Sequence, residues 1–198
     1  MEYTQTWASM EGMVEAGKCK AIGVSNFTQE QLEHLTSVAK IPPTVNQVEL
    51  HPYFQQSELM AYCESAGIVM MGYSPMGSSF DRFPDGHGTT LLKHPLVNEI
   101  AEAAGKTASQ VLIRFGLQKY PTNLVSIPKS SNAERIGQNF GVTDWELSDE
   151  AMTSLSGLES DFRYFISYLK KPDNDVKWHF GKVEAGDNSD WVGTPPSA

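Results

Sequence analysis

The sequence predicts an α/β fold in which about four strands form a parallel sheet and each strand is followed by a helix. Short apolar runs alternate with stretches of helical periodicity from about residue 21 to residue 158. Two of these runs stop abruptly in polar residues, at Ser25-Asn26 and at Lys129-Ser130. Polar groups that gather where strands end and helices begin form cofactor sites in α/β proteins. Because a closed barrel needs more strands, the sequence predicts half of such a site.

Apolar spacing and capping residues place the elements of the first half of the chain. Apolar residues recur at helical spacing before Gly17, and Thr28 is a typical helix N-cap. Prolines 42 and 43 end the helix that Thr28 begins, and Gly67 ends a helix that Ser57 caps. The expected elements are a helix over 4–17, a strand over 21–24, a helix from 28, a strand over 45–50, a helix from 57 and a strand over 68–73.

The second half begins with a long polar segment, residues 74–90, which is rich in Ser, Gly, Pro and Asp. Long loops in compact domains are commonly functional, so we expect a flap over a ligand. Gly105 and Thr107 separate two helices, and the sequence 147–150 is typical of a helix start. The expected elements are helices over 97–104 and from 107 to 117, a strand over 124–127, and helices over about 132–139 and about 147–158.

Composition excludes several classes of protein. The chain has 198 residues, a net charge of -9 and a pI near 5.0, with no basic run that would bind nucleic acid or an anionic membrane. No apolar run approaches a membrane span, and we expect a cytoplasmic protein. Cys19 and Cys63 are expected to be reduced thiols, and no histidine pair has metal-binding spacing, so no metal is expected.

We expect two parts in the chain, a barrel-type domain over residues 1–160 and a C-terminal loop or tail over 161–198. Helical periodicity is lost after Ser160, and the tail carries several aromatic residues. These aromatic residues either lie over the mouth of a pocket or fill gaps in a partly ordered tail.

Three polar residues near the first two strands are candidates for binding an amide or a ribose. Ser25 and Asn26 offer a hydroxyl and a carboxamide, although helix capping by Thr28 and a turn at Asn26 explain the same segment. Gln47 lies inside an apolar strand, where a buried amide needs partners. Together, Asn26 and Gln47 are placed to bind the two edges of a carboxamide.

Two further groups are candidates for binding a nucleotide. Tyr73 ends the third strand and precedes the small, hydroxyl-rich sequence 74–78, which suits a nucleotide, while a core tyrosine before a proline turn is the alternative. Lys129, Ser130 and the following two residues open a helix, and Arg135 lies about one turn further on. Backbone N–H groups, the helix dipole, hydroxyls and two cations converge there, which indicates a phosphate monoester.

Taken together, these motifs resemble the aldo-keto reductases, which are NADPH-dependent carbonyl reductases with a (β/α)8 barrel. The resemblance runs from about Trp7 to Arg163 and implies the C-terminal half of that barrel. The motifs that carry it are Gly17-Lys18, Gly23-Val24-Ser25-Asn26-Phe27, Asn46-Gln47-Val48-Glu49 with His51-Pro52, Tyr73-Ser74-Pro75 and Ile127-Pro128-Lys129-Ser130.

The resemblance implies a role in binding NADPH for each candidate. The nicotinamide carboxamide would be held by Ser25, Asn26 and Gln47, and the nicotinamide ring would stack on Tyr73. The pyrophosphate path would be lined by Ser74, Met76 and Ser78. The 2′-phosphate would be held by Lys129, Ser130 and Arg135, which favours NADPH over NADH, and Asn139 would contact the adenine. Gln138 departs from the acidic residue often found beside this contact in the family.

The same resemblance implies that no residue of this chain is catalytic. The family's catalytic tyrosine, lysine, aspartate and histidine lie on the first four strands, and this chain begins on what resembles the helix after the fourth strand. We therefore expect the NADPH-binding half of an oxidoreductase, which reduces aldehydes or ketones only when an N-terminal half is supplied.

Half a barrel would have open sheet edges and an exposed apolar inner face. We therefore expect self-association into a pseudo-barrel or pairing with a separate N-terminal half. A carbonyl substrate would be a partner only of the completed barrel. The alternatives are a non-catalytic NADPH-binding or protein-interaction half-barrel, and a longer natural chain in which Met1 is an internal methionine.

Overall fold

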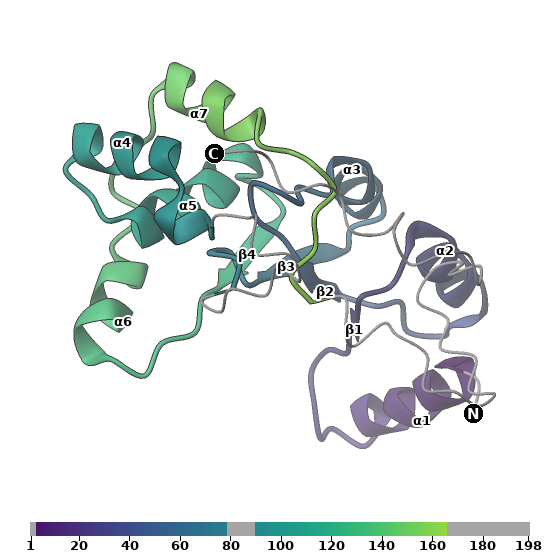
Figure 1. The fold of residues 1–198 in the computed structure, drawn as a ribbon. Coiled ribbons are helices and arrows are strands. Elements are labelled where there is room, and N and C mark those ends of the chain that lie inside the picture. The colour runs from purple at the N-terminus through teal and green to yellow at the C-terminus, as the bar shows by residue number, and fades with distance from the viewer. Residues whose placement is uncertain (1–2, 79–89, 166–198) are drawn as a thin grey trace, which may run out of the picture.

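The computed structural model describes residues 3–78 and 90–165, and its strands form one parallel sheet of four strands (Figure 1). The strands are β1 (Val24–Ser25), β2 (Val45–Glu49), β3 (Val69–Tyr73) and β4 (Leu124–Ile127). They lie side by side in chain order, and all neighbours are parallel. This arrangement confirms the predicted α/β fold with four parallel strands.

The register of the sheet decides which side chains share a face. Ser25 is the partner of Gln47 and Gln47 of Met71, while Glu49 is the partner of Tyr73. Since successive residues of a strand point to opposite faces, the side chains of Gln47, Glu49 and Tyr73 lie on one face of the sheet. The carboxyl ends of all four strands lie at the same end of the sheet, and the candidate site is located there.

Eight helical segments accompany the sheet within the described residues. Figure 1 shows α4 to α7 grouped beyond the β4 end of the sheet, and α1 and α2 beyond the β1 end. The helical segments are α1 (Tyr3–Glu15), α2 (Gln29–Val38), α3 (Ser57–Ser65), the short 3-10 helix η1 (Leu91–Lys93), α4 (Pro95–Ala104), α5 (Ala108–Lys119), α6 (Ala133–Phe140) and α7 (Asp149–Ser156).

Helix starts follow the predicted capping residues with one exception. Thr28 and Thr107 each accept a hydrogen bond from the backbone of the third helical residue and form a full capping box. Ser57, expected to cap α3, is instead its first residue, and Gln56 holds the N-cap position with no side-chain cap. The Ser57 hydroxyl lies instead 3.0 Å from the hydroxyl of the distant Tyr120, and Gln56 donates its side-chain amide to Glu49 O.

The first strand is shorter and later than the expected 21–24. Only Val24 and Ser25 pair with β2, although Ile22 O still accepts a hydrogen bond from Thr44 N at 2.9 Å. Gly23 comes close to β2, because a Cβ atom at this position would lie 2.8 Å from Val45 O. The glycine therefore lets the chain enter the sheet edge at close range.

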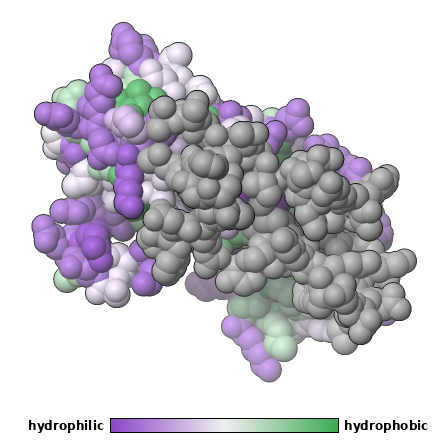
Figure 2. All heavy atoms as spheres, viewed as in Figure 1, coloured by the Kyte–Doolittle hydropathy of each residue, from purple (hydrophilic) through white to green (hydrophobic). Residues whose placement is uncertain are grey.

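Buried apolar side chains form separate clusters, which differ in the elements that they join. One cluster, including Leu32, Met60 and Met70, packs α2 and α3 against β2 and β3. A second cluster, including Leu112 and Phe162, joins α4, α5 and α7 to the residues after α7. Each fully buried side chain of this kind contributes about 1.5–3 kcal/mol relative to exposure. Much of the described surface over α4, α6 and α7 is hydrophilic in the view of Figure 2.

Some expectations concern absent features and can be checked only in part. Both Cys19 and Cys63 are free thiols, as expected. Within residues 3–78 and 90–165, no helix is long and apolar enough to span a bilayer. In the same residues, no group of three or more His, Cys, Asp or Glu side chains is arranged to hold a metal ion.

Candidate functional site

The structure brings Ser25, Asn26 and Gln47 together at the ends of β1 and β2. Gln47 O accepts hydrogen bonds from the Ser25 hydroxyl at 2.9 Å and from Asn26 N at 2.8 Å. The Asn26 side-chain amide donates to the Ser25 hydroxyl at 3.3 Å. Asn26 has a φ of 58°, in the left-handed region that asparagine tolerates better than most residues, so the chain turns sharply where β1 ends.

The fully buried amide of this region is Asn46, one position before the expected Gln47. The Asn46 side chain donates to Phe27 O at 2.9 Å and accepts from Phe27 N at 3.3 Å. Gln47 is only half-buried, and its side-chain amide lies 3.4 Å from the sulfur of Met71. Asn46 therefore holds the backbone after β1 in place, while Gln47 keeps an amide on the open face of the sheet.

Tyr73 connects the end of β3 to this group. Its hydroxyl donates to Asn26 Oδ1 at 3.1 Å. Burial, assisted by the nearby Glu49 carboxylate, raises the pKa of Tyr73 to about 12, although Arg163 and the bond to Asn26 oppose the shift. The phenol is therefore neutral at physiological pH and remains a hydrogen-bond donor.

The loop after β3 is described as far as Ser78. Ser74 has a φ of 52° and Gly77 a φ of 69°, and the ring of Tyr164 packs so close to Gly77 that a Cβ there would lie 2.5 Å from it. Ser78 is buried, and Met76 packs against the cluster around α4, α5 and α7. The rest of the predicted flap, residues 79–89, lies outside the described residues.

The cationic candidates follow β4 and lie at the surface. Lys129 and Arg135 are exposed, and Ser130 is half-buried. The helix begins at Ala133, with Asn132 as its N-cap, close to the expected start at about 132, so Lys129 and Ser130 lie before its first turn. The cause is a local hydrogen-bond pattern: the Ser130 hydroxyl accepts from Asn132 N at 3.1 Å, and Asn132 Oδ1 accepts from Arg135 N at 3.0 Å. An anion here would rely mainly on the two cationic side chains.

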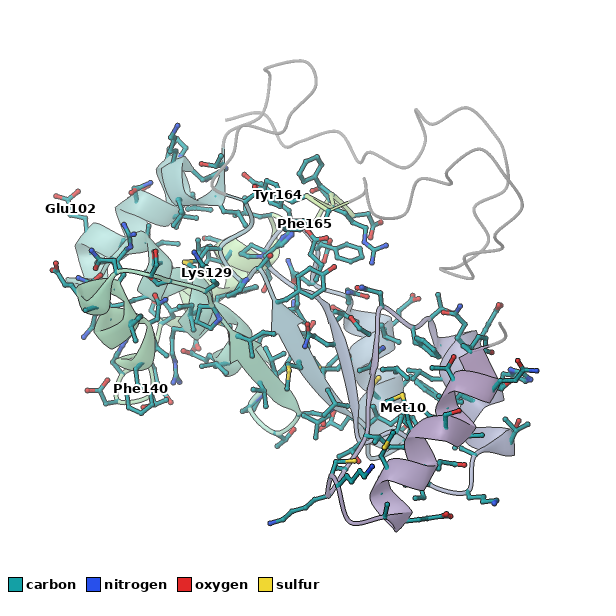
Figure 3. The ribbon with its side chains drawn as sticks, turned by 90° about the horizontal axis from the view of Figure 1, so that it is seen from below. Met10, Glu102, Lys129, Phe140, Tyr164 and Phe165 are labelled. Atoms are coloured by element: carbon teal, nitrogen blue, oxygen red, sulfur yellow. The ribbon has the colours of Figure 1, made fainter. Side chains whose placement is uncertain are left out.

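Asn139 lies in the last turn of α6, four residues after Arg135, so the two side chains share a helix face. In Figure 3, Lys129 lies nearer to Tyr164 and Phe165 than Phe140 does, while Phe140 marks the far end of α6. The candidate groups thus extend from β1, across β2 and β3, to the start of α6.

Sequence analysis missed a buried acidic residue beside this row of groups. Glu49, at the end of β2, accepts hydrogen bonds from Tyr164 N at 2.7 Å and from His51 Nε2 at 2.9 Å. Glu49 and His51 are each 1% exposed. Their presence in an apolar strand followed by a proline was the available indication, because a carboxylate in such a position must be paired.

The row of groups is chemically suited to a nucleotide with an amide at one end and phosphates at the other. Asn26 and Gln47 supply amide donors and acceptors, Tyr73 supplies a flat ring, and Lys129 and Arg135 supply positive charge. The Glu49–His51 pair is buried beneath residues 160–165, so it is not open to a substrate.

Comparisons with known proteins found one matching family and relatives that belong to it. A model of the Aldo/keto reductase family matches residues 1–160. The chain is 42% identical over 168 residues to aldo-keto reductase family 1 member A1 of Xenopus tropicalis, covering 85% of this chain and 50% of that protein. The human protein of the same name is 39% identical over 167 residues, covering 84% of this chain and 50% of that protein.

A solved structure of similar shape is the aldose reductase from Schistosoma japonicum. The two chains superpose with a TM-score of 0.70 at 35% sequence identity. The similarity covers 80% of this chain and 48% of the aldose reductase. The chain thus spans about half the length of the proteins that it matches.

Proposed function

We propose, since the chain belongs to the aldo/keto reductase family, that it binds NADPH across the carboxyl ends of its four strands. Completed by the other half of the barrel that its relatives contain, it would take part in the reduction of aldehydes and ketones to alcohols. The observation that carries this proposal is the row of Ser25, Asn26, Gln47 and Tyr73 in hydrogen-bond contact at the strand ends. The cytoplasmic location expected from the sequence remains a prediction.

The residues at the nicotinamide end fit an amide-bearing ring. Asn26 directly follows β1 and Gln47 lies on the neighbouring β2, and their side-chain amides match both edges of a carboxamide. Tyr73 has a neutral ring anchored through its hydroxyl, so it offers a fixed surface for stacking. These residues would orient the ring, and NADPH would supply the hydride.

The residues at the phosphate end fit a dianionic group. Lys129 lies before the Asn132 cap and Arg135 lies in the first turn of α6, and the Ser130 hydroxyl lies between them in sequence. Arg135 offers a planar fork that matches a phosphate, and Lys129 adds a point charge. This pair supports a preference for NADPH over NADH, because NADH lacks the 2′-phosphate.

The buried pair Glu49 and His51 is 1% exposed and held by Tyr164 N, so we assign it no catalytic role. We propose that the proton donor comes from the other half of the barrel. This chain would then bind and orient the cofactor, and the complete barrel would perform the reduction.

The direct test is a titration of NADPH with the chain, monitored by NADPH fluorescence. A separate assay measures NADPH oxidation in the presence of an aldehyde. We expect NADPH to bind more tightly than NADH, and no turnover until an N-terminal half from a relative is added. The matched variants are Arg135→Ala and, as a control on an exposed residue remote from the strand ends, Lys20→Ala. Equal binding of NADPH and NADH, or aldehyde-dependent turnover by the chain alone, would contradict the proposal.

A second candidate function is interaction through the open edge of the sheet, either with a second copy of the chain or with a complementary half. Val125 on β4 is 43% exposed, and Ile136 and Phe140 on α6 are 53% and 85% exposed. An unpaired strand edge and exposed large apolar side chains are each typical of an interaction surface. This candidate does not require turnover, and it is compatible with NADPH binding.

The oligomeric mass of the chain in solution distinguishes these possibilities. We expect light scattering to report a species larger than the 21.9 kDa monomer and Phe140→Ser to shift it toward the monomer. The control is Glu134→Ser on the same exposed helix. A monomer at all concentrations, unaffected by an added N-terminal half, would rule out interaction through this edge.

A further inference from the structure

We propose that Glu49 is a positioning residue that fastens residues 160–165 across the ends of β2 and β3. Its effect is to hold the Phe165 ring against Tyr73 as a wall of the nicotinamide site. The inference rests on the proposed function, because only a bound cofactor gives that wall a role.

The carboxylate of Glu49 is the fixed point of the arrangement. One oxygen, Oε1, accepts from both His51 Nε2, at 2.9 Å, and Tyr164 N, at 2.7 Å. The Glu49 and His51 side chains are 1% and 0% exposed. A buried carboxylate is costly unless it is hydrogen-bonded, so the two donors and the acceptor stabilise one another. Loss of the carboxylate would leave the amide of Tyr164 without this acceptor.

The segment is also attached through its backbone at a second point. Ser160 N and Phe162 N both donate to Tyr53 O, at 3.2 and 3.1 Å. Tyr53 and Glu49 lie on either side of His51, so the two attachment points belong to one short stretch after β2. Residues 160 to 164 therefore follow that stretch closely, and their path is set by main-chain hydrogen bonds.

Each of the last three described residues occupies a separate position on the strand ends. The Arg163 guanidinium lies 4.5 Å from the centre of the Phe54 ring, which is a cation–π contact. The Tyr164 ring packs on Gly77 and stacks with Tyr53, with ring centres 6.4 Å apart. The Phe165 ring meets Tyr73 at 75°, with centres 6.0 Å apart. A shift of the backbone at Tyr164 would therefore displace Phe165.

Glu49 and Tyr73 are also partners in the register of β2 and β3, so the fixed point lies beside the ring that it serves. Edge-to-face packing by Phe165 would add to the hydroxyl bond with Asn26 in restraining Tyr73. A restrained ring loses less freedom when it stacks on a ligand, so holding Phe165 in place should favour cofactor binding.

The hydrogen bond from Tyr164 N makes the fastening directly measurable, because it involves the peptide bond that trypsin cleaves after Arg163. We expect slow cleavage at this bond in the unaltered protein and at least a tenfold faster rate in Glu49→Ala. Glu49→Gln keeps a carbonyl acceptor and should restore most of the protection. The control is Glu64→Ala, since Glu64 is exposed and its carboxylate accepts only from the Thr122 hydroxyl among its described hydrogen bonds. Equal rates in Glu49→Ala and the unaltered protein would overturn the fastening.

The effect on the cofactor site needs a variant that keeps these hydrogen bonds. Phe165→Ala removes only the ring, and we expect the Kd for NADPH to rise three- to tenfold while protection of the Arg163–Tyr164 bond is unchanged. If the unaltered protein binds NADPH and Phe165→Ala binds it equally well, the wall is disproved. If the unaltered protein binds no NADPH, the proposed function fails, whereas the trypsin result still decides whether Glu49 fastens the segment.

The experiment remains decisive if Glu49→Ala does not fold. Amide hydrogen exchange on the unaltered protein then replaces the variant. We expect the Tyr164 amide to exchange at least ten times more slowly than the Asp161 amide, which is bonded only to the exposed Glu159 carboxylate among its described partners. Similar rates for the two amides would overturn the proposal.

Discussion

The nicotinamide end and the phosphate end of the proposed site are built differently, although both follow strands of the same sheet. On β2 and directly after it, Asn46, Glu49 and His51 are buried and bonded to neighbouring backbone or to each other. After β4, Lys129 and Arg135 are exposed, and α6 has no buried residue. One end is thus part of the protein's core, and the other is a surface feature.

The difference indicates how each end would recognise its part of the cofactor. The half-buried amides of Asn26 and Gln47 would select by shape and hydrogen bonding, so their buried neighbours must hold them in place before the ligand arrives. Exposed cations select by charge, and their contribution depends on ionic strength. Substitutions at the two ends should therefore separate effects on folding from effects on binding.

The largest expected effect is that of Asn46→Leu at the buried end. The substitution leaves Phe27 N and Phe27 O without their side-chain partner, and we expect the free energy of unfolding to fall by about 3 kcal/mol. NADPH binding should weaken as well, because Asn26 precedes Phe27. Urea unfolding checks the first effect, with Gln29→Leu on the exposed side of α2 as control. A loss below about 0.5 kcal/mol would show that Asn46 does not support this end.

Arg135→Ala at the exposed end should leave stability within about 0.5 kcal/mol of the original protein. The Kd for NADPH should nevertheless rise by about tenfold to a hundredfold, as expected for one charge-assisted hydrogen bond. The Kd for NADH should not change, and the effect on NADPH should shrink as salt is added. Titrations of both nucleotides at two salt concentrations measure this. A parallel loss of NADH affinity would place Arg135 elsewhere than at the 2′-phosphate.

The smallest expected effect is a dependence of stability on pH at the buried end. His94 is buried against the Tyr53 ring, and burial lowers the pKa of His94 below its usual 6.5. As pH falls, the imidazole is therefore protonated in the unfolded chain before it is protonated in the folded one. The contribution of neutral His94 to stability is complete above pH 6.5 and is lost as pH falls below this value. We expect the loss between pH 7 and 5 to be about 0.5 kcal/mol greater than in His94→Phe, since solvent screening limits the effect.

Identical pH profiles of urea unfolding for the two proteins would show that His94 does not titrate differently in the folded state. The matched control is His34→Phe, because His34 is an exposed residue on α2. Its removal should change the profile by less than that of His94. The comparison would then attribute the pH dependence to burial rather than to histidine content.

Sequence patterns predicted the sheet and most helices because these depend on local periodicity and capping. Thr28 and Thr107 could be assigned as caps, since the glutamine that completes each box lies three residues later. The Ser57 prediction was wrong because its hydroxyl partner, Tyr120, is 63 residues away and no local pattern reveals it. Hydrogen bonds between residues close in sequence could be predicted from the sequence, whereas pairing between distant residues could not.

For the candidate site too, some residues could be predicted from the sequence and others depended on contacts between distant residues. Ser25 and Asn26 stand at a strand end and could be found from composition, and the structure brings them to Gln47 and Tyr73. The greater burial of Asn46 than Gln47 depends on which face of β2 meets the helices, and alternation along one strand cannot decide that. The role of Glu49 depends on a contact with Tyr164, which only the folded chain reveals.

The order of the strands also has a consequence for the sequence in which contacts form during synthesis. Neighbouring contacts of β1 with β2 and of β2 with β3 span 22 and 24 residues, whereas the link from Ile68 to Asn123 spans 55 and that from Glu49 to Tyr164 spans 115. Contacts between distant residues close later, because longer loops must be ordered first. The nascent sheet can therefore grow strand by strand as it leaves the ribosome. Glu49 acquires its second donor only after Tyr164 has been added, so the wall beside Tyr73 is completed near the end of folding.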